Sequence, residues 1–215
     1  MRREAFIRSA ELPRGLFAKV KEKYPHLSQK DCELVAHGLR QFFLAHLKSG
    51  RKFLAMPSQA VDALWHEFIL HTKSYELYCR KAFGRFLHHT PAVVLTSNRQ
   101  KNTGLRRCWW FACKEENINP KSAARLPLLF ALDGKLNIAD GFRYVPDCQG
   151  VRRQDAAGAS SGAAYCGADF SSPAYDGGTD GFADGGGSDG SSSGSGGNDG
   201  CGGGGCGGGC GGGGD

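Results

Sequence analysis

The sequence lacks a long apolar run. No uncharged apolar stretch approaches the roughly 18–20 residues that cross a bilayer, and the basic beginning of the chain has no apolar segment ahead of a small-residue cleavage site. We therefore expect a soluble, cytoplasmic protein with no membrane span. Thiols stay reduced in that compartment. Because the nine cysteines are odd in number and irregularly spaced, a disulfide framework is not expected.

Nucleotide-binding and protease motifs are also missing. The chain has no P-loop, no GxGxxG leading into a helix and no internal repeat. His66, Glu67 and His71 resemble the zinc-protease motif HExxH, but the two histidines are five residues apart. On a regular helix this spacing puts them about 140° apart. They cannot chelate one ion in that arrangement, so we reject the protease interpretation.

Lysine and arginine are absent from the last 62 residues. Residues 1–153 hold all 27 basic residues and 13 of the 21 acidic ones, a formal charge of +14, whereas residues 154–215 hold eight Asp, a charge of −8. The same segment holds 25 of the 33 glycines and almost no aliphatic side chains, so it cannot offset the entropy lost on ordering. We expect one domain over residues 1–150 and a disordered, acidic, low-complexity Gly/Ser/Cys-rich tail over residues 151–215.

The basic domain suggests nucleic acid as a partner. Its basic residues are scattered, however, with only short doublets such as Arg106-Arg107 and Arg152-Arg153. Without a recognisable module, any binding to nucleic acid is expected to be non-specific and to be weakened by the acidic tail. An unidentified protein partner is the other candidate.

Apolar spacing predicts a mostly α-helical domain. A first helix begins after Pro13 and is stopped by Pro25. A second begins at Ser28, whose capping box is completed by Asp31 three residues later, and it ends near Gly50.

The apolar phase continues over residues 58–83, which predicts one long helix, bent at Ser74 and closed by Gly84 in the left-handed conformation. Weaker patterns predict a helix over 99–116, a short helix over 127–132 that stops at Gly134, and a short strand or extended surface segment over 142–145.

The segment 62–91 concentrates side chains that bind metals or move protons. It holds a Trp, a Cys, two Tyr, three Phe and four of the seven His. Asp62 and His66 are four residues apart and share a helix face, so the carboxylate can orient the imidazole for metal binding or proton transfer. The alternative is a hydrogen bond on the helix surface that satisfies a half-buried histidine.

His88 and His89 follow the helix-ending glycine, in a loop that can fold back along the helix. Neighbouring residues of an extended segment point in opposite directions, so at most one of the two should aim at Asp62 and His66. Two hypotheses follow. One is a site for a divalent transition metal made by Asp62, His66 and one of these histidines; the other, which we prefer on sequence alone, is structural hydrogen bonding to carbonyl groups of the turn.

Cys79 shares the apolar face with Trp65 and Tyr75. A buried cysteine behaves as a small hydrophobic residue, and this is the expected role. A thiolate nucleophile is the alternative, but no oxyanion motif or third partner accompanies it.

The remaining cysteine candidates differ in setting. Cys108 and Cys113 are five residues apart in a predicted helix, which does not suit joint zinc binding and indicates core residues. Cys201, Cys206 and Cys210 lie in CGGGGCGGGC, whose glycines allow almost any geometry for a soft metal or a redox reaction. Ordering so much glycine is costly, so disorder is the preferred interpretation.

A combination of residues resembles the glycine-rich domain-containing protein-like family, closest to its small bacterial members. The matching residues are Trp65-His66, Tyr75, Cys79, Phe83-Gly84, His88-His89-x-Pro91, the stretch RLPLLFALDGKL and the Gly-rich end. The resemblance covers residues 28–148, and the tail by composition. It implies a helical domain in a largely uncharacterised family and supplies no catalytic residues. Some larger plant relatives carry an RNA-recognition module that this chain lacks, so no RNA role follows.

The leading hypothesis is therefore a non-enzymatic binding or scaffold protein in which the Trp/His/Cys segment is structural. The alternative is a metal-binding protein or metalloenzyme that uses Asp62, His66 and His88 or His89, with a divalent transition metal as its cofactor. The sequence singles out no catalytic residue and no site for an organic cofactor.

Overall fold

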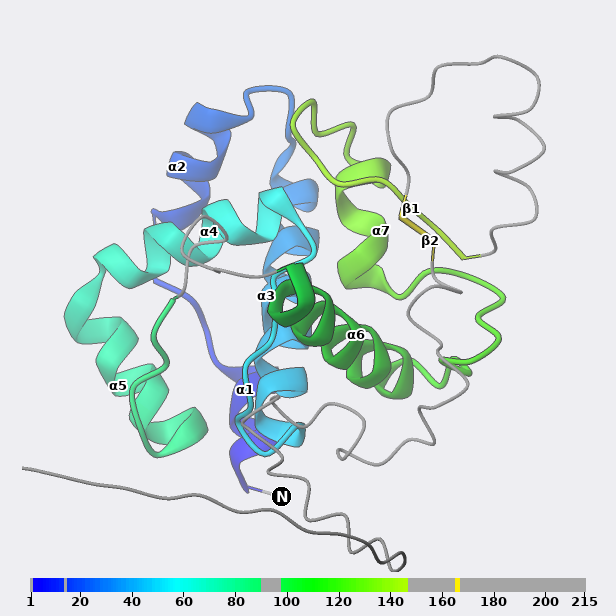
Figure 1. Ribbon diagram of the computed structural model, residues 1–215. Helices are drawn as coiled ribbons and strands as arrows, with labels where there is room; N and C mark the ends of the chain where they lie inside the picture. The colour runs from blue at the N-terminus through cyan, green and yellow to red at the C-terminus, as the bar shows by residue number, and fades with distance from the viewer. Residues whose placement is uncertain (1, 14, 90–97, 147–164, 167–215) are drawn as a thin grey trace, which may run out of the picture. The chain divides into compact units, whose positions relative to one another are not determined.

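The computed structural model describes residues 2–13, 15–89, 98–146 and 165–166. These residues form seven helices and one pair of short strands (Figure 1). The elements are α1 (Arg2–Ser9), α2 (Leu16–Lys23), α3 (Gln29–Lys48), α4 (Gln59–Leu70), α5 (Thr72–Phe83), α6 (Asn98–Glu115), α7 (Leu128–Lys135), β1 (Tyr144–Val145) and β2 (Tyr165–Cys166). The prediction of a mostly α-helical fold is confirmed. Apart from β2, the predicted tail lies outside the described residues, so its disorder and the boundary at residue 150 stay predictions.

Helix α3 is the element around which the others pack. It contacts α1, α2, α4, α6 and α7 (Figure 1). Its start is fixed by the predicted capping box: Asp31 N donates to Ser28 Oγ at 3.2 Å, and Ser28 N donates to Asp31 Oδ2 at 2.9 Å. It ends at Lys48, close to the predicted Gly50, which has a φ of 72°.

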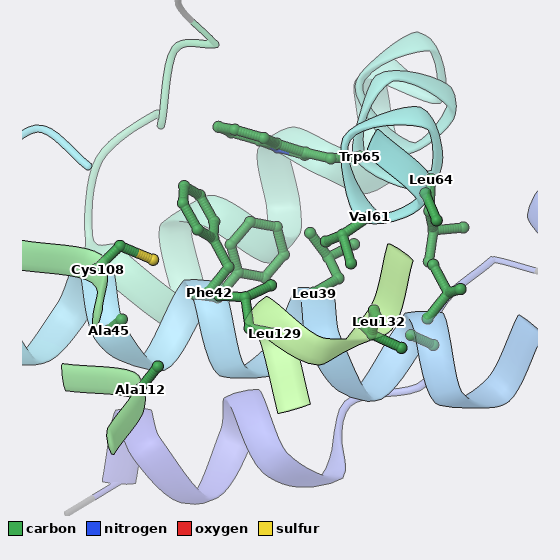
Figure 2. Close-up of a cluster of buried hydrophobic side chains, with 14 of the residues drawn as sticks. Leu39, Phe42, Ala45, Val61, Leu64, Trp65, Cys108, Ala112, Leu129 and Leu132 are labelled. Carbon is green, nitrogen blue, oxygen red and sulfur yellow. The ribbon is translucent and has the colours of Figure 1, made fainter. Parts of the chain in front are cut away.

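The core lies between α3 and the helices that cover it. Figure 2 shows side chains from α3, α4, α6 and α7 meeting there. The labelled residues are Leu39, Phe42, Ala45, Val61, Leu64, Trp65, Cys108, Ala112, Leu129 and Leu132. Fully burying a Leu, Val or Phe side chain stabilises the fold by about 1.5–3 kcal/mol. A Cβ on Gly38 would lie 2.4 Å from Leu132 Cδ1 and 2.9 Å from Val61 Cγ2, so this glycine allows α4 and α7 to approach α3 closely.

The prediction of one continuous helix over residues 58–83 was wrong. The chain leaves the helical conformation at His71 (φ −78°, ψ 57°), which separates α4 from α5, and no break occurs at Ser74. A straight helix would separate residues 65 and 75 by about 15 Å. Instead, Trp65 Nε1 donates to Tyr75 Oη at 3.1 Å. The apolar residues of α5 still continue the helical periodicity of those in α4, because only one residue departs from helical geometry.

Several short elements were predicted incompletely. Helix α1 was missed because Ile7 is its only fully buried residue, too little for a periodic signal. Helix α7 runs to Lys135, past the predicted end. β1 fits the strand alternative, but it is not a surface segment, since Tyr144 is buried and its ring lies 5.0 Å from that of Phe130. Its parallel partner β2 was not predicted.

Among the described residues, no helix combines the length and the apolar character needed to cross a membrane.

Candidate metal centre

The N-terminus of α4 is held by a buried carboxylate from α7. Asp133 is 1% exposed. Its Oδ1 accepts hydrogen bonds from Ser58 Oγ (2.6 Å) and Ala60 N (3.2 Å), and its Oδ2 accepts from Gln59 N (2.8 Å) and Phe142 N (2.9 Å). A negative charge at a helix N-terminus also interacts favourably with the helix dipole. Asp133 thus fixes the first turn of α4, on which the candidate site stands.

Sequence reasoning missed Asp133. A signal was present, because Leu129, Phe130 and Leu132 occupy the buried face of α7 and Asp133 continues the same run. A carboxylate in an apolar run must find hydrogen-bond donors inside the protein, but the sequence alone does not say which ones.

Asp62, one turn into α4, lies between two imidazole rings. His89 Nε2 is 2.9 Å from Asp62 Oδ1, and His66 Nδ1 is 3.4 Å from Asp62 Oδ2. Because an ionised carboxylate only accepts hydrogen bonds, His89 donates from Nε2. One ligand atom from each of the three residues can be chosen so that all lie within 4.8 Å of one another. The structure therefore brings together Asp62, His66 and His89.

His88 does not join this cluster. It is exposed, and its ring lies 4.9 Å from the ring of Phe86. This fits the expectation that at most one of the two adjacent histidines reaches Asp62 and His66, and His89 is that residue.

The loop that carries His89 is anchored by Tyr75, a buried side chain of α5. Gly84 closes α5 in the left-handed conformation (φ 77°), as predicted. Tyr75 Oη accepts from Trp65 Nε1 and donates to the carbonyl of Leu87 at 2.6 Å, two residues before His89. The His89 ring also packs against Trp65, with ring centroids 4.6 Å apart. These contacts leave the His89 side chain only 12% exposed and hold its ring beside Asp62.

Two imidazole nitrogens and one carboxylate oxygen suit Zn²⁺, Fe²⁺, Co²⁺ or Mn²⁺. Atoms that share one ion at about 2.0–2.2 Å lie at most about 4.4 Å apart. In the tetrahedral arrangement that Zn²⁺ adopts, they lie about 3.4 Å apart, so side chains whose ligand atoms now lie within 4.8 Å of one another must rotate inward to share an ion. Three protein ligands would leave coordination positions open, as catalytic metal sites do.

Residues 2–170 match the family model described as UCP032817-like. The chain belongs to this family. A search of curated proteins and a search of solved structures found no match. The family's description states no activity, and the match does not bear on the resemblance to glycine-rich domain-containing proteins. The matched range of this UCP032817-like chain includes Asp62, His66 and His89.

A cavity of about 110 Å³ adjoins the cluster. Asp62 and His89 line it, and His66 does not. The other lining residues are Phe42, His46, Phe53, Leu54, Ala55, Met56, Ser58, Gln59, Trp65, Leu87, His88 and Phe142. The cluster therefore stands at the edge of a largely apolar hollow, with His66 on the outer side, where its side chain is 49% exposed.

The candidate thiols do not add to this site. Cys79 is buried, and burial raises the pKa of its thiol, which disfavours the thiolate that a nucleophile or a metal ligand requires. Cys108 and Cys113 are also buried and free, as expected of core residues. Cys201, Cys206 and Cys210 lie outside the described residues.

Proposed function

We propose that this protein binds one divalent transition metal ion through Asp62, His66 and His89. The observation that carries the proposal is the convergence of three side chains from two separate segments, with ligand atoms within 4.8 Å of one another. Asp62 and His66 come from one face of α4, and His89 comes from the loop after α5. The donor set is one that Zn²⁺ and Fe²⁺ sites use.

A purely structural role explains the cluster less well. The His66 side chain is 49% exposed and lies 3.4 Å from Asp62, a long contact. Exposed pairs of this kind contribute about 0–1 kcal/mol to stability. His89, by contrast, is held by Trp65 and the anchored loop whether or not it bonds to Asp62. The His89–Asp62 hydrogen bond and the looser His66–Asp62 contact can therefore be exchanged for bonds to an ion.

The bound ion would act through its open positions. Such an ion can polarise a substrate oxygen or lower the pKa of a bound water. Ion binding would displace the His89 proton that faces Asp62, and both imidazoles must be neutral to bind an ion, so affinity should fall in acid. A protein partner, or non-specific contact with nucleic acid, stays a prediction, and the metal-binding proposal does not depend on either.

The metal proposal is tested by the stoichiometry and affinity of the full chain for Zn²⁺ and Co²⁺. Calorimetry should give one equivalent per chain at the cluster. His66→Gln, His89→Gln and Asp62→Asn should each weaken binding at least about 100-fold, because ligand loss should exceed the 10–100-fold cost of changing a supporting residue.

Two controls separate this site from its neighbours. His88→Gln changes the adjacent imidazole outside the cluster and should leave affinity unchanged. Replacing Cys201, Cys206 and Cys210 together by Ser removes the tail thiols and should also leave the cluster site intact. Wild-type affinity in all three cluster variants, or loss of the metal only when the tail thiols are replaced, would overturn the proposal.

A further inference from the structure

We propose that the cavity beside Asp62 and His89 binds a small monocarboxylate with an apolar body, and holds its carboxylate against the bound ion. This inference rests on the proposed metal site, because the ion supplies the positive charge that attracts the anion. It adds a class of ligand to that site, and it makes binding of the ligand depend on the metal.

The charge of the loaded cluster favours an anion. A divalent ion bound by the Asp62 carboxylate and two neutral imidazoles leaves a net positive charge at the cluster. Among the described residues that line the cavity, Asp62 is the only carboxylate, and no Lys or Arg is present. A net charge beside a largely apolar hollow is less screened than it would be in water, so it attracts an anion strongly. Without the ion, the Asp62 carboxylate would repel the same anion, and the metal therefore reverses the preference of the cavity.

The position of the cluster places the carboxylate of the ligand. Asp62 and His89 belong both to the cavity wall and to the proposed ligand set, whereas His66 does not line the cavity. An ion bound by the three residues therefore borders the cavity through Asp62 and His89. Three protein ligands leave coordination positions open, and carboxylate oxygens are ligands of Zn²⁺ and similar ions. The carboxylate of a molecule in the cavity can fill such a position.

Gln59 offers a hydrogen-bond donor for the second oxygen of that carboxylate. It lines the cavity and precedes Asp62 by three residues in α4, so the two side chains are neighbours on one helix face. A side-chain amide carries two N–H donors. One of them can be donated to the oxygen that the ion does not bind, which reduces the cost of removing the anion from water.

The size and the walls of the cavity set the body of the ligand. The apolar part of its lining comes from Phe42 in α3, residues 53–56 between α3 and α4, Trp65 in α4, Leu87 after α5 and Phe142 after α7. An engineered apolar cavity of about 150 Å³ holds benzene. A cavity of about 110 Å³ therefore suits a body of about four carbon atoms. Each methylene buried there should add to the affinity.

The experiment uses the full chain with Cys201, Cys206 and Cys210 replaced by Ser and loaded with Co²⁺, whose visible absorption reports its coordination. The signal followed is the absorption that His66→Gln abolishes, so that it reports the cluster. The probes are pentanoate, 1-pentanol and pentylamine, which share one carbon chain, and acetate, which lacks three of the methylenes. We expect pentanoate to change the spectrum saturably and to bind at least about tenfold more tightly than each of the other three probes.

Two cavity-filling variants and the metal-free chain provide the controls. Ala55→Leu and Met56→Phe enlarge wall residues outside the ligand set. Each should keep Co²⁺ and lose the preference for pentanoate over acetate, because the body of the ligand no longer fits. Calorimetry should detect binding of pentanoate to the loaded chain and none to the metal-free chain.

Several outcomes would overturn this inference and leave the metal proposal standing. They are a spectrum that pentanoate does not change, equal or tighter binding of any other probe, binding of pentanoate without metal, and an unchanged preference for pentanoate in the folded cavity-filling variants. Absence of Co²⁺ binding at the cluster would overturn both proposals. Because the two wall residues are changed separately, one variant that fails to fold does not remove the control.

Discussion

Two carboxylates at the same end of α4 differ in almost every physical respect. Asp133 is 1% exposed and accepts hydrogen bonds from a hydroxyl and three backbone amides. The Asp62 side chain is 25% exposed and faces His66 and His89. The donors around Asp133 are locked in the fold, since backbone amides cannot move away. The donors around Asp62 are imidazoles, which can release a proton and bind an ion instead.

We therefore infer that Asp133 serves the fold and Asp62 serves binding, although both lie at the first turn of α4. A saturated, buried carboxylate has no room and no free lone pair for a ligand, so its role is to organise the chain. A partly exposed carboxylate with exchangeable partners contributes little to folding and can change partners. Removing each carboxylate should therefore produce opposite results: a large loss of stability at Asp133, and a loss of metal at Asp62.

The largest expected effect is that of Asp133→Ala. This change leaves Ser58 Oγ and the amides of Gln59, Ala60 and Phe142 without their acceptor in the interior. We expect the free energy of unfolding to fall by about 3–5 kcal/mol, measured by urea denaturation. Asp140→Asn is the matched control in the same region, because Asp140 is exposed and its loss should cost less than about 1 kcal/mol. Equal losses in the two variants would contradict the role assigned to Asp133.

An intermediate effect is expected at Tyr75, which supports the Asp62 site from a distance. Tyr75→Phe removes the hydroxyl that joins Trp65 Nε1 to the carbonyl of Leu87. The loss should cost about 1–3 kcal/mol. Because the Leu87 contact positions His89, metal affinity should also weaken by about tenfold, measured by calorimetry at a temperature where the variant is folded.

Tyr78 is the matched control for Tyr75. Both tyrosines lie on α5 and both are buried, but Tyr78 Oη has no hydrogen-bond partner among the residues that the structure describes. Tyr78→Phe therefore removes an unsatisfied polar atom, and stability should change by less than about 0.5 kcal/mol or rise. Metal affinity should be unchanged. If the two variants behaved alike, the Tyr75 hydrogen bonds would not be what holds the loop.

The sequence predicted the local elements of the site better than their assembly. The Ser28–Asp31 capping box, the closing Gly84 and the shared face of Asp62 and His66 follow from spacing over a few residues, and the structure has all three. Local spacing also allowed one of two adjacent histidines to reach that face.

The features that the sequence did not predict are set by contacts that local spacing does not describe. The break at His71 brings Trp65 Nε1 within hydrogen-bond distance of Tyr75 Oη, a contact that no periodicity reveals. Asp133 meets the start of α4 from a position more than 70 residues away. The choice of His89 over His88 depends on how Tyr75 anchors the loop. In each case the partner lies beyond the few residues over which helical spacing applies, so the pattern around the residue does not identify it.

Apart from the control variants, the smallest expected effect on stability is that of Asp62→Asn in the metal-free protein. Asn has the same shape, keeps one oxygen that can accept from His89, and lies where water can replace the weak contact to His66. We expect the free energy of unfolding to change by less than about 1 kcal/mol. With Zn²⁺ present, the wild type should be stabilised and the variant should not, since only an ion bound to the folded state raises stability. A loss of more than about 2 kcal/mol without metal would mean that Asp62, like Asp133, serves the fold, and the structural hypothesis for the histidine cluster would then be the correct one.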